Sequence, residues 1–150
     1  MPSQNATKTG SCLCGAVRFE VSGPLKPVVG CHCTMCRKQT SHYLAFTAAW
    51  LEDFNLVQQE SLKWFRSSAD SRRGFCGDCG SILFFATDGD AKISIAAGSF
   101  DGDTGLATAA HIFVGDKGDY YELTDGARQH VQGGDKVPMP PRHPVVWHFS

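Results

Sequence analysis

The sequence predicts a mainly β domain built from several short antiparallel strands. Apolar residues alternate with polar ones over short runs, which is the period of a half-buried strand. No window carries the sustained apolar stripe that an amphipathic helix needs. The 16 glycines and 7 prolines are scattered, which is typical of many turns that join short elements.

Six runs carry the strand pattern, and most of them end at a recognisable turn. In chain order they are residues 17–21, 43–49, 62–64, 82–86, 92–95 and 110–114. The first alternates Val and Phe with charged residues before a Gly-Pro turn, the second is a continuous apolar run, and the third alternates weakly. Asp-Gly, Gly and Gly-Asp close the last three in that order. Short helices are expected only at residues 33–40 and 124–131.

The pattern indicates one domain. A chain of 150 residues is long enough to bury roughly 68–70% of its unfolded surface, so it can form a core without help from disulfides or metal ions. No linker, low-complexity tract or repeat divides the chain. We therefore predict a flexible N-terminus over residues 1–9 and a single domain over residues 10–150.

Composition excludes several classes of protein. A net charge of −1, with 42% hydrophobic and 19% charged residues, argues against a disordered chain and against a basic nucleic-acid clamp. No apolar run reaches the roughly 18 residues of a membrane span, and the first ten residues lack the apolar segment of a secretory signal. We expect a cytoplasmic protein without nucleic-acid or membrane partners.

Seven cysteines are the most unusual feature of the chain. The number is odd, so they cannot all pair in intramolecular disulfides. In a reducing cytosol, cysteines of this kind more often bind metal or react. They fall into three clusters, Cys12/Cys14, Cys31/Cys33/Cys36 and Cys76/Cys79.

The first and third clusters look like two halves of one metal site. In an extended segment, residues two apart point to the same side, so a Cys-x-Cys unit can give two thiolates to one ion. Gly15 and Gly80 follow these clusters, and a glycine with positive φ lets backbone N–H groups turn toward the sulfurs. Four thiolates favour Zn²⁺ or an iron–sulfur cluster.

The middle cluster has three thiols, and three ligands with an open fourth position are the arrangement of a catalytic zinc. Arg37 and Lys38 follow Cys36 directly, so we predict that they carry the positive charge of a substrate site. Two alternatives remain open. Either His32, His42 or a carboxylate closes a second structural site, or the Cys-x-x-Cys pairs at 33/36 or 76/79 are redox dithiols.

Five segments resemble the glutathione-dependent formaldehyde-activating enzyme family, to which centromere protein V belongs. They are GSCLCGAVRFE (residues 10–20), CHCTMCRK (31–38), FCGDCGS (75–81), AGSFD (97–101) and HIFVGDK (111–117). The resemblance extends over about residues 10 to 130. Two departures stand out, which are Ser41 in place of a common glycine and Gly118–Asp119–Tyr120 in place of an Ala-Pro-Trp-like segment.

The resemblance implies a zinc-binding β-tent fold with two zinc ions per chain. It implies a structural zinc on Cys12, Cys14, Cys76 and Cys79, and a catalytic zinc on Cys31, Cys33 and Cys36. It also implies carbon–sulfur lyase chemistry, in which glutathione and formaldehyde combine reversibly to S-hydroxymethylglutathione.

We therefore expect a zinc-dependent carbon–sulfur lyase for thiol adducts, with a small thiol such as glutathione as substrate. Glutathione carries two carboxylates, so its site should contain cations, and Arg37 and Lys38 are the predicted ones. For Arg72 and Arg73, a solvated surface charge is the favoured interpretation. The alternative function is a non-catalytic, zinc-stapled protein-binding module.

Overall fold

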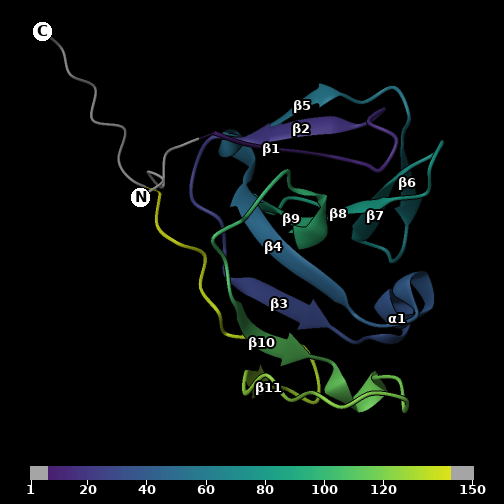
Figure 1. Cartoon of the computed structure of the whole chain (residues 1–150), viewed down its shortest axis with the longest axis vertical. Helices are drawn as coiled ribbons and strands as arrows, with labels where there is room; N and C mark the ends of the chain where they lie inside the picture. The colour runs from purple at the N-terminus through teal and green to yellow at the C-terminus, as the bar shows by residue number, and fades with distance from the viewer. Residues whose placement is uncertain (1–6, 143–150) are drawn as a thin grey trace, which may run out of the picture.

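The computed structural model describes residues 7–142 and confirms a mainly β domain (Figure 1). Its strands are β1 (Lys8–Ser11), β2 (Arg18–Val21), β3 (Val28–Cys31), β4 (Leu44–Trp50), β5 (Phe54–Gln58), β6 (Leu62–Arg66), β7 (Ser71–Cys76), β8 (Ile82–Thr87), β9 (Lys92–Ala96), β10 (Thr108–Ile112) and β11 (Arg128–Gln129). One α-helix, α1 (Thr34–Thr40), and three 3-10 turns, η1 (Leu51–Asp53), η2 (Ala97–Ser99) and η3 (Val114–Asp116), complete the described elements.

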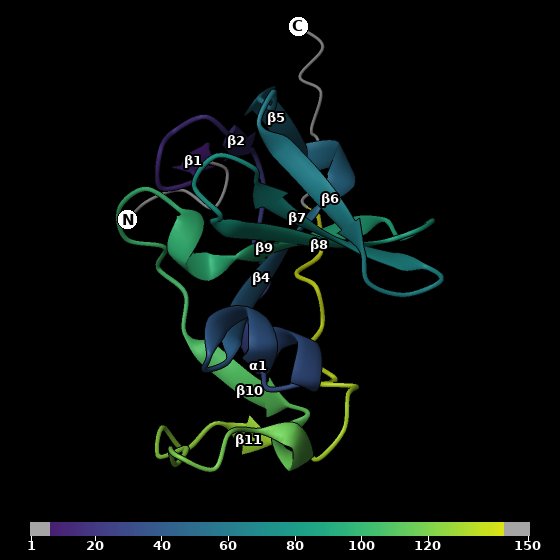
Figure 2. The same cartoon turned by 90° about the vertical axis from the view of Figure 1, so that its right-hand side faces the viewer.

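The strands form two sheets. The smaller has the order β1-β2-β5, and the larger has the order β11-β10-β3-β4-β9-β8-β7-β6. Most pairs are antiparallel, as predicted, but β10 pairs in parallel with both β3 and β11. The parallel β3–β10 pair joins segments about 80 residues apart, a long-range contact that local alternation does not reveal. Figure 2 shows α1 in front of β10.

The core lies between the two sheets. Phe19 of β2 packs edge-on against Phe84 and Phe100, with ring centroids 5.4 and 5.3 Å apart. Gly10 lets β1 pass over Phe19, since a Cβ there would lie only 2.3 Å from the Phe19 ring. This cluster also includes Cys12 and Cys76, whereas Cys31 and Cys36 belong to a second, smaller buried cluster with Leu44 and Ala96. Each predicted metal site therefore lies in its own part of the core.

Several sequence predictions need correction. Residues 124–131 form no helix and include the short strand β11, and the alternation missed β1, β3, β5 and β7 as well. The prediction of a flexible segment over residues 1–9 is wrong for its last two residues, because Lys8 and Thr9 of β1 pair with Val21 and Glu20 of β2. Residues 1–6 and 143–150 lie outside the described residues.

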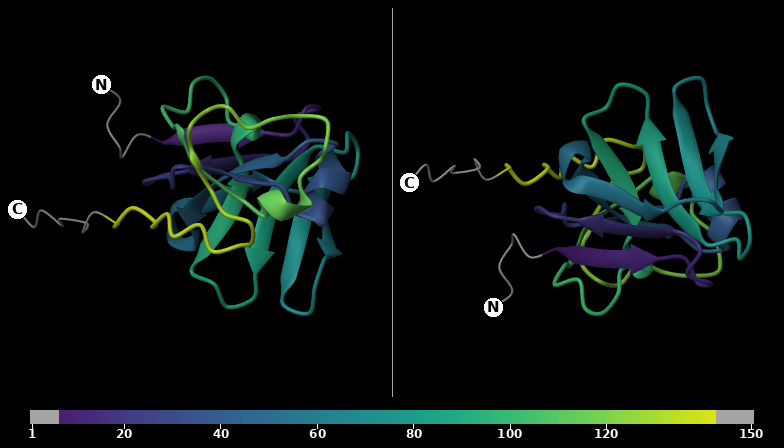
Figure 3. Two further views of the ribbon diagram at one scale, coloured as in Figure 1. Left: turned by 90° about the horizontal axis from the view of Figure 1, so that it is seen from below. Right: turned by 90° about the horizontal axis from the view of Figure 1, so that it is seen from above.

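The last described residues, 133–142, run as an extended segment (yellow in Figure 1) that three of its residues attach to the rest of the domain. The Asp135 carboxylate pairs with the Lys26 ammonium at 3.0 Å. The Trp50 indole N–H donates to the Pro140 carbonyl at 3.0 Å, and Arg142 forms ion pairs with Glu52 and Asp53. In both views of Figure 3 the end of this segment lies on the same side of the molecule as the start of β1, in purple.

No helix within residues 7–142 has both the length and the apolar character needed to cross a membrane.

Candidate metal centres and active site

The first and third cysteine clusters come together as predicted. Cys12 and Cys14 precede β2, Cys76 ends β7, and Cys79 follows in the turn before β8. The four sulfurs lie within 4.8 Å of one another. The Cys12–Cys14 and Cys14–Cys76 sulfur distances are 3.6 and 3.8 Å. A tetrahedral zinc with Zn–S bonds of about 2.3 Å requires sulfurs about 3.8 Å apart, so this cluster fits the ion.

The backbone around these sulfurs has the form that the glycines predict. Gly15 and Gly80 have φ values of 82° and 78°. The Val17 N–H donates to the Cys12 sulfur at 3.3 Å, and the Asp78 N–H donates to the Cys76 sulfur at 3.4 Å. A hydrogen bond from the Ser81 hydroxyl lowers the pKa of Cys79 to about 5. Donors of this kind stabilise thiolates, which are the form that binds metal.

The second cluster lies where β3 meets α1. Cys31 ends β3, Cys33 is the N-cap of α1, and Cys36 lies in its first turn, with the Cys36 N–H 3.4 Å from the Cys33 sulfur. The three sulfurs lie within 4.8 Å of one another, and no further Cys, His, Asp or Glu of residues 7–142 joins them. Three thiolates on a strand end and a helix start therefore fit a zinc ion with an open position.

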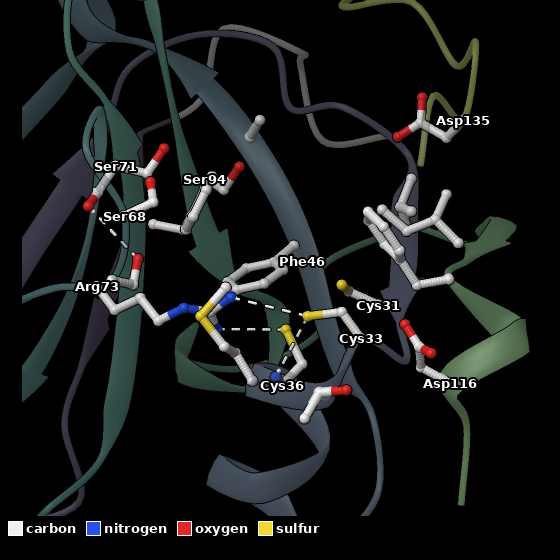
Figure 4. Close-up of a pocket in the computed structure, with 18 of the residues that line it drawn as sticks. Cys31, Cys33, Cys36, Phe46, Ser68, Ser71, Arg73, Ser94, Asp116 and Asp135 are labelled. Carbon is white, nitrogen blue, oxygen red and sulfur yellow. Dashed lines mark hydrogen bonds between the residues drawn. The ribbon is translucent and has the colours of Figure 1, made fainter. Parts of the chain in front are cut away.

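One arginine lies against these sulfurs (Figure 4). The buried Arg73 donates from Nη1 to the Cys36 sulfur at 3.3 Å and to the Gln39 side-chain oxygen at 2.8 Å. Its Nη2 lies 3.9 Å from the Cys33 sulfur. Its buried Nε finds no acceptor within the described residues, so a donor is left free beside the thiols. The expectation that Arg73 is a solvated surface charge is therefore wrong.

Neighbouring groups divide the charge among the three thiols. Hydrogen bonds from the Cys31 and Cys36 thiols hold the pKa of Cys33 well below its usual range, and the charge of Arg73 acts in the same direction. The same contacts with Cys33 and Cys36 raise the pKa of Cys31.

Arg37 and Lys38, the predicted substrate-binding cations, lie on α1 but do not line the cavity beside the thiols. The Arg37 Nε donates at 3.2 Å to the carbonyl of Asp116, a residue that lines the cavity, and Lys38 is exposed. Their role in binding substrate stays a prediction.

His32 does not close the second site, although it lies between two of the cysteines. Its Nδ1 meets the Tyr121 hydroxyl at 2.6 Å, and its Nε2 meets the His111 Nδ1 at 2.9 Å. The His111 Nε2 meets the Asp125 carboxylate at 2.8 Å, so both buried rings are fully bonded. Burial, followed by the charge of His111, lowers the pKa of His32 to about 4. This chain of side chains fixes the backbone between Cys31 and Cys33.

The three thiols open onto a cavity of about 470 Å³. Its walls include side chains from β10, β3, β4, β9, β8 and β7, which are consecutive neighbours in the larger sheet. The sheet therefore curves, with the cavity on its concave face. Ser94 faces the cavity while its neighbours Ile93 and Ile95 face the core, as strand alternation requires.

Comparison with known proteins places this arrangement in a family. The model of the glutathione-dependent formaldehyde-activating enzyme family matches residues 7–116, a stretch that includes all seven cysteines. The chain belongs to this family. It is also similar to an uncharacterized lyase of Schizosaccharomyces pombe, with 30% identity over 118 residues that cover 77% of this chain and 85% of the relative.

A solved structure shares the fold of this member of the formaldehyde-activating family. It is the crystal structure of a Rhodobacter sphaeroides protein, with a TM-score of 0.55 and 22% identity. The match covers 65% of this chain and 91% of that one.

The two departures from the formaldehyde-activating family pattern lie in contact. Ser41 ends α1 with a φ of 63°, the left-handed conformation that favours glycine. The Tyr120 hydroxyl donates to the Ser41 carbonyl at 2.5 Å. The two changes therefore alter one place, the loop that follows α1.

In this family member, two sulfur clusters of the observed geometry predict two zinc ions per chain. Elemental analysis of protein purified without added metal measures the ratio directly. Iron in stoichiometric amount, or no zinc at all, contradicts the prediction. Chelation followed by a second analysis is expected to remove the ion of the three-thiolate site first, because that site has one ligand fewer.

Proposed function

We propose that the protein is a zinc-dependent carbon–sulfur lyase that forms and breaks adducts between thiols and aldehydes. The observation that carries the proposal is the cluster of Cys31, Cys33 and Cys36, which opens onto a cavity and has Arg73 at its side. A closed structural site needs neither a cavity nor a buried cation.

The reaction is a simple redistribution of one bond and one proton. In the breakdown direction the C–S bond of a thiohemiacetal breaks and its electron pair stays on sulfur. The hydroxyl group loses its proton to water, and its oxygen forms the C=O bond of the released aldehyde. A zinc ion held by Cys31, Cys33 and Cys36 would lower the pKa of a thiol that joins it, which would favour the thiolate product.

The side chains of this chain supply the remaining requirements. Three protein thiolates exceed the charge of a divalent ion by one, and the fourth sulfur of a substrate adds another negative charge. The Arg73 guanidinium lies against Cys36 and Cys33 and offsets this excess where water is excluded. Arg37 and Lys38 are proposed to attract the charged part of the thiol from outside the cavity.

The alternative is a zinc-stapled protein-binding module without catalysis. The cavity and the buried arginine support the enzyme instead, because a docking surface needs neither. The printed name of the yeast relative, a lyase, also supports it. Seven free thiols suit a reducing compartment, and we propose the cytoplasm.

The test is the binding of glutathione to protein whose zinc has been replaced by cobalt. We expect glutathione to change the cobalt absorption bands, since a sulfur joins the ion at the three-thiol cluster. Calorimetry in two buffers of different ionisation enthalpy should show the release of a proton. If no small thiol perturbs the bands, the lyase proposal is wrong and the binding module takes its place.

Charge reversal on α1 tests the predicted substrate cations. Arg37→Glu and Lys38→Glu are expected to weaken glutathione binding about three- to tenfold while leaving the thermal melt unchanged. Arg128→Glu is the matched control, because Arg128 is exposed on β11 and does not line the cavity. Equal effects in all three variants would show that only the net charge of the protein matters.

A further inference from the structure

The cavity is much larger than the group that formaldehyde contributes to an adduct. A hydroxymethyl group fills roughly 60 Å³, about twice the share of one water molecule. The cavity holds about 470 Å³. Apart from the thiols, its walls are mainly apolar, with side chains of Val29, Met35, Phe46, Phe85, Ile112 and Phe113. A cavity of this kind takes an organic group, because filling it with water leaves apolar surface wet.

Both cations that line the cavity already have partners in the protein. The two Nη atoms of Arg73 face the sulfurs and Gln39, which leaves only its buried Nε without an acceptor. Lys26 also lines the cavity and comes before β3 begins, roughly 17 Å along an extended chain from Cys31 at about 3.3 Å per residue. Its ammonium is paired with Asp135 at 3.0 Å, and the side chains of both are at least four-fifths buried.

Acidic groups also lie at both ends of this cavity. Asp135 stands at the far wall, and Asp116 stands near Cys33 (Figure 4). A carboxylate inside the cavity would therefore meet Lys26, which Asp135 already neutralises, and the exposed Asp116, which forms no ion pair within residues 7–142. Because burial of an unpaired charge costs several kcal/mol, the carboxylates of a thiol such as glutathione must stay outside.

From these observations we infer that the enzyme acts on thiohemiacetals that carry an uncharged apolar group, of the size of a phenyl ring or a branched alkyl chain, which the cavity holds. The inference rests on the proposed lyase function. The apolar group belongs either to the thiol or to the aldehyde. In both cases a neutral hydrophobic substituent lies next to the C–S bond that reacts. Asp135 is the residue that keeps anionic substituents out, by holding Lys26.

Matched thiols test the preference on cobalt-substituted protein. The probes are phenylmethanethiol, its para-carboxylate analogue and glutathione, with the dissociation constant measured from the cobalt bands. We expect phenylmethanethiol to bind at least about tenfold more tightly than either anionic thiol, as burial of an aromatic ring predicts. Equal affinities exclude the thiol as the carrier of the apolar group, and together with slow turnover of benzaldehyde with glutathione they overturn the inference while the lyase proposal stands. Silent bands for all three thiols overturn both.

Two substitutions locate the effect in the cavity. Ser94→Phe fills the volume and is expected to lower the affinity for phenylmethanethiol relative to glutathione at least tenfold, while Ser94→Ala keeps the wild-type ratio. Asp135→Asn frees the Lys26 ammonium, so the para-carboxylate analogue is expected to gain at least about tenfold in affinity. An unchanged ratio in Ser94→Phe, or no gain in Asp135→Asn, overturns the inference.

Turnover then distinguishes the two sources of the apolar group. Benzaldehyde with glutathione places the ring on the aldehyde, and formaldehyde with phenylmethanethiol places it on the thiol. Adduct breakdown faster than for glutathione with formaldehyde is expected for one of the two pairs, and that pair identifies the half that enters the cavity. If both apolar pairs react more slowly, the inference is wrong.

Discussion

Cys76→Ser is expected to unfold the protein under conditions in which Cys33→Ser stays folded and inactive. Cys76 is fully buried in the larger core cluster and joins β7 to the segment before β2 through the four-sulfur site. A closed structural zinc contributes its binding free energy to folding. We therefore expect Cys76→Ser to lower the free energy of unfolding by about 3 kcal/mol or more.

Cys33→Ser acts on the other site. Serine is a preferred N-cap, so the start of α1 is kept and the loss of stability should stay within about 1 kcal/mol. Loss of a metal ligand should lower lyase activity more than about 100-fold, since even residues that only support ligands account for 10- to 100-fold. Thermal melts and activity assays of the two variants measure both effects. Equal large losses of stability would show that the three-thiol site is structural as well.

Arg73→Gln is expected to lower lyase activity and thiol affinity about 30- to 100-fold, with little change in fold. Glutamine keeps a donor for Gln39 but removes the positive charge beside Cys36 and Cys33. Removing one charged donor from a water-excluded reaction site has effects of this size. The pH at which a thiol binds the cobalt-substituted protein is expected to rise in this variant, because the thiolate loses a stabilising charge.

The neighbouring residue provides the control. Arg72 is exposed on the opposite face of β7 and stacks over the Trp64 ring at 4.1 Å. Arg72→Gln removes the same charge from the same strand without touching the sulfurs, so activity and the binding pH should stay at wild-type values. If the two variants lose activity equally, the role assigned to Arg73 is wrong.

The two groupings of cysteine sulfurs could be predicted from the sequence because their information is local. Each cluster is a short Cys-x-Cys or Cys-x-x-Cys unit, and Gly15 and Gly80 mark the turns that aim N–H groups at sulfur. The four-plus-three partition follows from these units and is confirmed as a grouping of sulfurs. The strands with clear alternation, such as β2 and β9, were predictable for the same reason.

Arg73 and the cavity could not be predicted, because both depend on how distant strands pair. A bulge between Gly74 and Phe75 interrupts the alternation of β7, and the strand turns Arg73 to one site and Cys76 to the other. The one available signal was the position of Arg73 three residues before Cys76, but the bulge between them means that regular alternation does not fix their faces. The curvature of the larger sheet, which encloses the cavity, depends on the pairing of distant strands, so no single segment of the sequence indicates it.

The segment that carries Asp135 has a consequence for how such proteins diverge. The family match ends at residue 116, after the last cysteine and after every strand of the larger sheet except β11. Asp135 comes later, on a segment that a few side-chain contacts hold in place, yet it forms one wall of the cavity. We expect mutations there to reshape this wall without disturbing either set of sulfurs. One wall of the cavity thus lies outside the stretch that carries the cysteines, and a lineage can change it while keeping them.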